Sequence, residues 1–497
     1  MTLRMKLFSM ALSSMIIGMA QAETVRVAIG TQDTTINCAA GGALIRELKL
    51  LEKYLPRDGR YKDTRYDIQW RNFTSGAPLT NEMVAGKLDI GSMADFPGSF
   101  NGTAFRKAGK QSLFISVLSG STTGSGNGIV VPKASPVQSL AELKGKTISV
   151  PFASTSHGML LRAIAQQGWD PNRDVTIITQ SPEIAGSALQ ANKIDAHADF
   201  VPFAELFPYR GFARKIYDGS QANAPTMHGS LVDAEYARKY PEVVIAFLRA
   251  AIEADRLLAA EPEKYSELIS RVTGIEPEVI YLFHGPLGLQ TRDFTWKPEY
   301  RQAVKTSIET LRLIKRTAVD LDVDKFIDDQ YIRAAFRQAG LDYEAHLKNY
   351  AQLPLSARDA GTGQPITDIR RVAQIWVKGE PLVRHYASPE SAFADLNMLE
   401  KAGKKIRVVY VQDSNHGIKL LGSDAWFVQG KDSVSGFLLK DDAEAWARTH
   451  GGKVLDFGAV KTAFASRESK VAARDKQPER AGKVISSPQS VVSAITR

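Results

Sequence analysis

The chain has 497 residues, of which 44% are apolar and 24% are charged. These proportions are ordinary for a folded protein and exclude general disorder, and the length suggests about three structural units. Cys38 is the only cysteine, which excludes an intramolecular disulfide and a multi-cysteine zinc or iron–sulfur site. The net charge is +9, but the sequence has no basic stripe interleaved with aromatic residues, so we expect no nucleic-acid partner.

The N-terminal segment is typical of a cleaved export signal. Arg4 and Lys6 precede an apolar run at residues 7–20, and the A-Q-A sequence that ends at Ala22 fits a cleavage site, so we expect a signal peptide at 1–22. A membrane anchor is the alternative, but the run is shorter than the ~20 residues that span a bilayer. We therefore expect a periplasmic protein, in which a large core makes disulfides optional.

From residue 24 onward, strand-like and helix-like segments alternate. Residues 24–30 alternate in polarity and end in glycine, which predicts a first β-strand. Apolar residues at helical spacing then predict a helix at 39–54. Strands are expected at 66–73 and 88–91, with a helix at 78–85 between them. This alternation predicts βαβ units, a mostly parallel sheet and an α/β fold class.

A second unit of the same kind begins near residue 128. Its elements are strands at 128–131, 146–150, 175–179 and 196–199, and helices at 139–143, 156–168 and 185–191.

Beyond this unit the pattern becomes helical and then changes again. Helices are expected at 236–260, 263–273, 297–315 and 323–339. Glycine and proline residues predict a linker at 351–369. A small α+β unit follows at 370–465, with strand-like runs at 372–377, 406–411 and 425–428 and a helix at 441–450. The basic, polar segment at 466–497 is expected to be disordered.

Six segments within residues 24–330 carry a resemblance to a known family. In chain order they are F-T-S-G at 73–76, M-V-A-G-K-L-D-I-G at 83–91, L-A-E-L-K-G-K-T-I at 140–148, S-T-S-H at 154–157, A-N-K-I-D-A at 191–196 and Y-P-E-V-V-I-A-F-L at 240–248. Together they resemble the solute-binding proteins of nitrate, sulfonate and taurine ABC importers. The resemblance implies a type II periplasmic binding protein fold, with one lobe at 23–118 and 226–350, a second lobe at 119–225, and a hinge between them.

The resemblance also implies a function. A small polar ligand, with a sulfonate, nitrate or similar anion as the first expectation, is captured by hinge closure and delivered to the membrane subunits of an ABC permease. We expect a monomer without a cofactor. An enzyme is the alternative, but the sequence has no G-x-S-x-G elbow, no H-E-x-x-H helix and no P-loop, so we expect no catalysis.

Three loops have the character of an anion site. In open parallel sheets, ligands bind beyond the carboxyl ends of strands, where helix N-termini offer free N–H groups and partial positive charge. The loops at 30–35, 74–76 and 154–157 each follow a predicted strand and carry hydroxyl groups, for which pure helix capping is the alternative role. The ligand contacts expected from them are Gln32, Thr34, Thr35, Ser75, Gly76, Ser154, Thr155, Ser156 and His157.

Further contacts are expected by family analogy, which places two pairs of neighbouring residues at the cleft, Asp95-Phe96 and Asp199-Phe200. A Gly/Ser-rich segment at 119–127 is expected to serve as hinge and cleft lining. Because a carboxylate repels an anion, the two acids alternatively cap helices, pair with arginine, or receive a cationic or neutral polar ligand. The additional expected ligand residues are Asp95, Phe96, Ser121, Thr122, Asp199 and Phe200.

Metal binding is expected in neither part of the chain. His157, His197, His228 and His284 lie in no close ligand-spacing motif.

The C-terminal unit resembles a second family. Its segments at 424–428 and 441–455 are similar to the NosL family, which are copper-carrying accessory proteins of nitrous-oxide reductase maturation. The Cys-Gly-Met segment that binds metal in that family is absent, which leaves Met398, His416 and His385 as candidate copper ligands. A copper-handling accessory or sensory protein is therefore the alternative function, and a docking module is the alternative role of this unit.

Overall fold

The computed structural model describes residues 23–36, 41–314, 317, 320–350, 355 and 357–475. The expected signal peptide lies outside the described residues. Within them, no helix combines the length and the apolar character that a membrane crossing requires.

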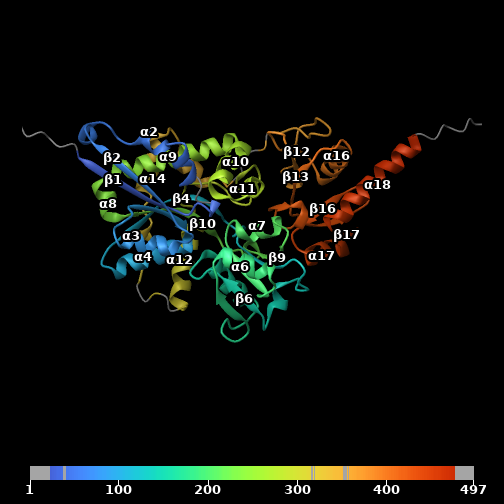
Figure 1. Ribbon diagram of the computed structural model, residues 1–497, viewed down its shortest axis with the longest axis horizontal. Helices are drawn as coiled ribbons and strands as arrows, with labels where there is room; N and C mark the ends of the chain where they lie inside the picture. Colours follow the sequence, from blue (N-terminus) through green and yellow to red (C-terminus); the bar gives the residue numbers. More distant parts are fainter. Residues whose placement is uncertain are drawn as a thin grey trace, which may run out of the picture.

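The first lobe is built on a five-stranded sheet with the order β2-β1-β3-β10-β4 (Figure 1). Its strands are β1 (Thr24–Thr31), β2 (Arg65–Asn72), β3 (Ile90–Ala94), β4 (Ser112–Ser121) and β10 (Thr226–Asp233). β1 runs parallel to β2 and β3, whereas β10 is antiparallel to both β3 and β4. The sheet is thus mixed but mostly parallel: β1, β2, β3 and β4 run in one direction, and only β10, which returns from the second lobe, runs in the other.

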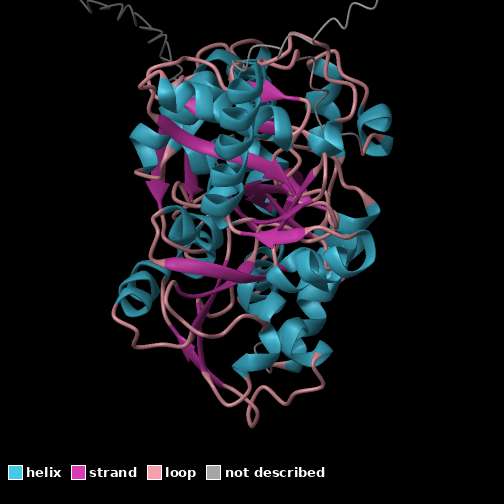
Figure 2. Cartoon of the chain, turned by 90° about the vertical axis from the view of Figure 1, so that its right-hand side faces the viewer, coloured by secondary structure: helices cyan, strands magenta, loops and turns pink. Residues whose placement is uncertain are grey.

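Helices cover this sheet and supply the first core. Val27, Ile29, Leu51 and Phe247 are fully buried where strands and helices meet. The helices are α1 (Ala43–Glu47), α2 (Leu50–Tyr54), α3 (Gly76–Val84), α4 (Asp95–Lys107), α8 (Ala234–Lys239), α9 (Pro241–Ala260), α10 (Pro262–Thr273), α11 (Pro277–His284), α12 (Pro298–Leu313), α13 (Val323–Phe326), α14 (Gln330–Gln338) and α15 (Tyr343–Lys348), with a 3₁₀ turn η2 (Gly59–Tyr61). Figure 2 shows helices lying along both sides of the strands.

Three helices that the sequence predicts as continuous are divided. The segment predicted at 323–339 forms α13 and α14, with residues 327–329 between them. The segment predicted as one helix at 39–54 breaks at Lys49, whose φ of 51° is left-handed, so α1 and α2 point their apolar residues into the core separately. The segment at 236–260 divides before Pro241, because proline lacks the N–H that would continue α8 and is suited to the first position of α9.

The second lobe has its own five-stranded sheet, with the order β7-β6-β8-β5-β9. Its strands are β5 (Gly128–Pro132), β6 (Thr147–Val150), β7 (Thr176–Thr179), β8 (Ala196–Asp199) and β9 (Ala213–Asp218), and its helices are η3 (Leu140–Leu143), α5 (Thr155–Gln166), α6 (Pro182–Gln190) and α7 (Phe203–Tyr209). The sequence predicts the first four of these strands. Ile129, Ile148, Leu160 and Ile164 are fully buried in the core of this lobe.

The chain crosses between the two sheets at 122–127 and again at 219–225, where η4 (Gly219–Ala222) lies. Ser121 shapes the first crossover, because its Oγ accepts hydrogen bonds from the backbone N–H groups of Gly124 and Ser125, each at 3.0 Å. The Oγ of Ser125 in turn donates to the carbonyl of Leu289 at 2.7 Å. The two crossovers have the arrangement that hinge motion requires.

The C-terminal unit contains two antiparallel sheets, β12-β11-β13-β14 and β16-β15-β17. Its elements are η5 (Ile369–Arg371), β11 (Ala373–Val377), β12 (Arg384–Tyr386), α16 (Pro389–Lys401), β13 (Ile406–Gln412), β14 (Lys419–Leu421), η6 (Gly422–Asp424), β15 (Trp426–Gln429), β16 (Val434–Phe437), α17 (Lys440–His450), β17 (Lys453–Leu455) and α18 (Phe457–Asp475). This unit lies beside α7 and α11 (Figure 1). α18 extends to Asp475, into a segment expected to be disordered, and residues 476–497 lie outside the described part.

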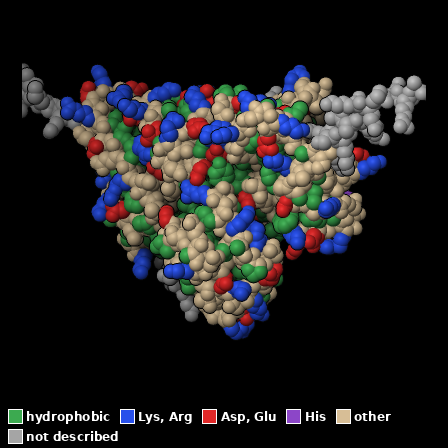
Figure 3. Space-filling model, turned by 45° about the vertical axis from the view of Figure 1, so that its right-hand side comes forward, with side chains coloured by type: hydrophobic (Ala, Val, Ile, Leu, Met, Phe, Trp, Pro, Cys, Tyr) green, Lys and Arg blue, Asp and Glu red, His purple; other side chains and the backbone are tan. Residues whose placement is uncertain are grey.

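The surface carries both signs of charge. Figure 3 shows Lys and Arg side chains intermixed with Asp and Glu over the face in view, without a continuous basic stripe there.

Candidate ligand-binding cavity

A cavity of about 220 Å³ lies between the two lobes. Its walls are the loops that follow strands of both sheets, which is where ligands bind in open α/β sheets. The lining residues of the first lobe are Gln32, Thr35, Thr74, Ser75, Gly76, Ala77, Ala94, Pro97 and His228, and those of the second lobe are Pro151, Phe152, Ala153, Ser154, Thr155, Thr179, Gln180, Ser181, Pro182 and Phe200.

Four helices begin at this cavity. The N-cap residues of α3, α4, α5 and α6 are Ser75, Ala94, Ser154 and Ser181, and all four line the wall. Only Ser154 caps its own helix through its side chain, by accepting a hydrogen bond from the N–H of His157. Helix N-termini carry unsatisfied N–H groups and about half a positive charge each. These termini place partial positive charge at the wall, and none of the described lining residues is charged.

Three polar atoms of the wall have no hydrogen-bond partner among the described residues. They are the Oγ1 atoms of Thr35 and Thr155 and the Oε1 atom of Gln180, and all three atoms are buried. Buried polar atoms in folded proteins are almost always hydrogen-bonded. All three atoms belong to residues of the cavity wall, where the two hydroxyls can donate to a bound molecule and the amide oxygen can only accept.

The remainder of the wall is apolar. Phe152 and Phe200, both from the second lobe, face the cavity together with three prolines and three alanines. Apolar and aromatic walls with a few placed polar groups are typical of sites for small organic molecules.

The structure brings together seven of the residues expected from the sequence: Gln32, Thr35, Ser75, Gly76, Ser154, Thr155 and Phe200 line the cavity. The other eight, which are Thr34, Asp95, Phe96, Ser121, Thr122, Ser156, His157 and Asp199, are not part of its lining. Ser156 and His157 instead shape the start of α5, where the Oγ of Ser156 lies 2.8 Å from that of Ser154.

Asp95 is held inside the first lobe. Its carboxylate accepts hydrogen bonds from the hydroxyls of Ser307 at 2.7 Å and Thr226 at 3.0 Å. Burial raises the pKa of Asp95 above its usual value. Its neighbour Phe96 is also buried and packs toward Gly158 of the second lobe.

Asp199 belongs to a buried chain of polar side chains in the second lobe. Its Oδ2 lies 2.7 Å from Nε2 of His197, whose Nδ1 lies 2.7 Å from the Oγ of Ser149. The three residue types are those of a hydrolase triad. All three residues are fully buried, so no substrate reaches the serine, and burial raises the pKa of Asp199.

Sequence reasoning misses several wall residues. The loop at 179–182 escapes it because the next helix is predicted to begin at 185, although serine followed by proline is a helix-start signal and α6 begins at Pro182. His228 lies on β10, whose sequence has no clear periodicity, so its position at the wall could not be predicted. Burial and the nearby His284 lower the pKa of His228 to about 3, so this wall residue is neutral.

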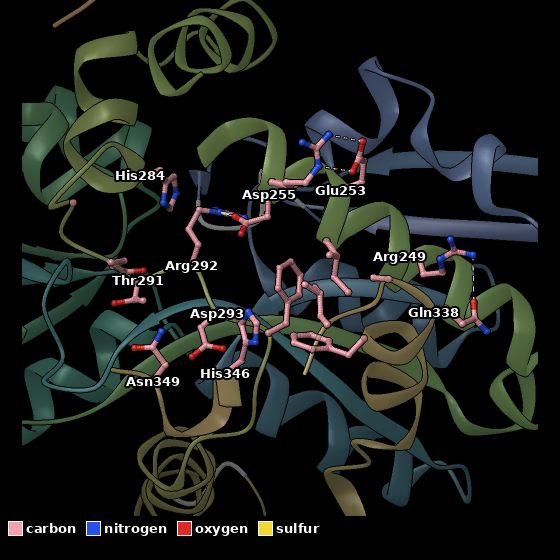
Figure 4. A pocket seen from close by; sticks show the side chains of 18 of the residues that line it. Arg249, Glu253, Asp255, His284, Thr291, Arg292, Asp293, Gln338, His346 and Asn349 are labelled. Carbon is pink, nitrogen blue, oxygen red and sulfur yellow. Dashed lines mark hydrogen bonds and ion pairs between the residues drawn. The ribbon is translucent and has the colours of Figure 1, made fainter. Parts of the chain in front are cut away.

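A second, larger cavity of about 620 Å³ lies within the helical part of the first lobe (Figure 4). Its lining comes from α9, from the segment at 284–294 and from α14 and α15, with no residue of the second lobe. Four of its charged side chains pair with one another, Arg292 with Asp255 and Arg256 with Glu253. The interlobe cavity differs in that both lobes contribute polar groups to its wall.

Comparisons with known proteins agree with this architecture. A family model described as the NMT1-like family matches residues 21–273, which is half of the chain. The chain belongs to the NMT1-like family. This family region ends before the C-terminal unit begins.

Relatives of this NMT1-like protein include two from Escherichia coli K12. The putative aliphatic sulfonates-binding protein is 29% identical over 54% of this chain and 78% of its own, and the taurine-binding periplasmic protein is 29% identical over 55% and 86%. These relatives are binding proteins, which agrees with the expectation that the chain is not an enzyme.

Solved structures show the same fold. The alkanesulfonate-binding protein SsuA from Xanthomonas axonopodis pv. citri, bound to MOPS, superposes with a TM-score of 0.51 at 24% identity, covering 62% of this chain and all of its own. The aliphatic sulphonate binding protein SsuA from Escherichia coli gives 0.50 at 26% identity, covering 62% and 98%. The expected two-lobed periplasmic binding protein fold is therefore confirmed.

Proposed function

We propose that the protein is the solute-binding component of an ABC importer and that it captures an organic sulfonate or a closely related oxyanion between its lobes. The observation that carries this proposal is the meeting of four helix N-termini at a cavity whose lining residues are all uncharged. Such termini bind anions through N–H groups without a counter-charge.

Both lobes contribute to the binding of the anion. α3 and α4 belong to the first sheet and α5 and α6 to the second, so an anion that contacts all four helix ends favours the closed arrangement of the lobes. The lobes in this proposal are residues 23–118 with 226–350 and residues 119–225, and the closed form is recognised by membrane permease subunits. The names of the sulfonate- and taurine-binding relatives support the ligand class and a periplasmic location after removal of residues 1–22.

A ligand screen on the purified protein tests this function. The melting temperature is measured with ethanesulfonate, butanesulfonate, MOPS, sulfate, nitrate and copper, followed by calorimetric titration of each active compound. A cognate ligand at 100 times its Kd adds about 2.7 kcal/mol to the free energy of unfolding. Sulfonates are expected to stabilise the protein, and stabilisation by copper alone would contradict the proposal.

For the C-terminal unit we propose a docking role. The copper-handling alternative draws no support from the described residues, among which no group of three His, Cys, Asp or Glu side chains is placed to hold a metal ion. Met398 is exposed on α16, whereas His385 is largely buried on β12 and its Nδ1 lies 3.0 Å from the Nε2 of Gln374. The resemblance to the NosL family stays an expectation from the sequence, and we do not extend it to copper transport.

A further inference from the structure

Among the described residues, no carboxylate lines the ligand cavity, although three acidic residues stand next to lining residues in the sequence. Asp33 follows Gln32, Asp95 follows Ala94, and Asp199 precedes Phe200. This arrangement bears on the charge of the ligand, because a carboxylate is the group that would pair with a ligand ammonium.

Each of these three carboxylates is occupied within its own lobe. Asp33 pairs with Arg46 at 2.9 Å and accepts a hydrogen bond from the hydroxyl of Thr31 at 2.8 Å. Asp95 and Asp199 are engaged by the hydroxyls and the histidine described above. None of the three is free to turn toward the cavity without leaving a buried donor unsatisfied.

The polar groups that do face the cavity are neutral. The Thr35 and Thr155 hydroxyls can donate to an anion, whereas the unpartnered Oε1 of Gln180 can only accept, and none of these groups supplies a compensating negative charge. The helix N-termini add positive potential, which repels a ligand cation. The rest of the wall, with Phe152 and Phe200, suits an apolar chain or ring.

We propose that this cavity selects sulfonates with an uncharged organic tail and rejects zwitterions such as the ω-aminosulfonate taurine. The inference rests on the proposed sulfonate function and deepens it. A zwitterion would have to bury its ammonium among neutral groups and helix N-termini, whereas an alkanesulfonate buries only methyl and methylene groups.

Two matched ligand pairs test the proposal by calorimetric titration of the full-length protein. The pairs are ethanesulfonate against taurine and propanesulfonate against 3-aminopropanesulfonate, which differ only by the amine. We expect each amine-free ligand to bind at least about 30-fold tighter, given the penalty for an unpaired buried charge.

Adding a carboxylate should reduce this preference. Gln180→Glu converts a wall amide into an acid of the same length, and Ala153→Asp places an acid at a wall residue whose φ of 55° aspartate tolerates better than most residues. We expect either variant to lower the ratio of the two affinities about tenfold or more, because the acid attracts the ammonium and repels the plain sulfonate. Gln190→Glu, on an exposed residue at the end of α6 outside the cavity lining, is the matched control for net charge and should leave the ratio unchanged.

The outcomes separate this inference from the function on which it rests. Binding of taurine as tight as that of ethanesulfonate would overturn the selectivity and leave the sulfonate function standing. Failure of all four ligands to bind would overturn both. A ratio that stays at the wild-type value in both folded cavity variants would overturn the role of the missing carboxylate.

Discussion

The ligand cavity and the joint, which is the contact of Glu278 and Tyr281 with Arg407, Tyr410 and Lys419 of the C-terminal unit, both contain polar groups but use them in different ways. At the cavity the lining side chains are uncharged, and the hydroxyls of Thr35 and Thr155 have no partner among the described residues. At the joint the polar groups are charged and engaged. Nε of Arg407 lies 2.5 Å from Glu278, and Tyr410 donates to the carbonyl of Glu278 at 2.7 Å.

Lys419 makes the contrast clearest. Its amino group is buried at the joint, donates to the carbonyl of Pro286 at 3.2 Å and lies over the rings of Tyr281 and Tyr410 at 4.2 and 4.4 Å. Burial lowers the pKa of Lys419 well below its usual value. Polar groups that are hydrogen-bonded across the joint hold the lobes and the C-terminal unit in one arrangement. Polar groups without a protein partner can instead form hydrogen bonds with a ligand.

The largest expected effect comes from breaking a buried charge cluster close to the joint. Lys215 lies 2.5 Å from Asp218, also pairs with Glu205, and its side chain is only 5% exposed. Lys215→Met would leave two buried carboxylates without their cation, which should lower the free energy of unfolding by about 3–5 kcal/mol. Urea unfolding followed by circular dichroism measures this loss.

The matched control for that experiment is Lys193→Met, because Lys193 is exposed in the same lobe. Its effect should stay within about 0.5 kcal/mol. A loss below about 1 kcal/mol for Lys215→Met would contradict the view that this cluster stabilises the fold, because breaking a buried ion pair costs several times more.

Hydrogen bonds between residues far apart in the chain also explain how much of the fold and of the site could be predicted from the sequence. Alternating strand and helix patterns are local, so β1, β2, β3 and β5 to β8 could be predicted, whereas β4 (Ser112–Ser121) was missed. Whether Asp95 faces the cavity depends on hydroxyls 131 and 212 residues away in Thr226 and Ser307, and no local spacing records that. The left-handed break at Lys49 is likewise invisible in the sequence, because lysine is an ordinary helix residue.

A smaller effect is expected at the joint itself. Arg407→Met keeps much of the side-chain volume over the Trp376 ring but removes the bonds to Glu278 and Glu267. Because Glu278 is buried, we expect a loss of about 1.5–3 kcal/mol, confined to the joint. Hydrogen exchange of α11 and β13 measures this local opening.

Arg370→Met provides the comparison, since the Arg370 side chain is 84% exposed and its ion pair with Asp368 is at the surface. Surface pairs contribute about 0–1 kcal/mol, so exchange in α11 should be unchanged. Equal protection of α11 in the two variants would mean that the joint does not depend on paired charges.

A substitution at the cavity should have the opposite effect: it should weaken sulfonate binding and leave the free energy of unfolding unchanged. Thr155→Val removes a hydroxyl that has no partner within the described fold, so the free energy of unfolding should change by less than about 0.5 kcal/mol. A lost hydrogen bond to an anion corresponds to about tenfold weaker sulfonate binding. Thr462→Val on α18, outside the cavity lining, should change neither quantity beyond error. Unchanged affinity in Thr155→Val would remove this loop from the site.

The smallest expected effect is that of pH on sulfonate affinity. His228 is the lining residue of the cavity whose charge would change near neutral pH if its pKa were ordinary, but burial lowers that pKa to about 3 and His284 opposes protonation further. A sulfonate stays ionised throughout this range. If binding drew a proton onto His228, affinity would rise as pH falls through the 6–7 range; with His228 neutral in both states, no proton is exchanged. Titrations at pH 5, 6, 7 and 8 should therefore agree within about twofold in the wild type and equally in His228→Gln. If affinity increases steadily toward pH 5 in the wild type but not in His228→Gln, His228 takes up a proton when the anion binds. The cavity would then be charged in the bound state, unlike the neutral cavity proposed above.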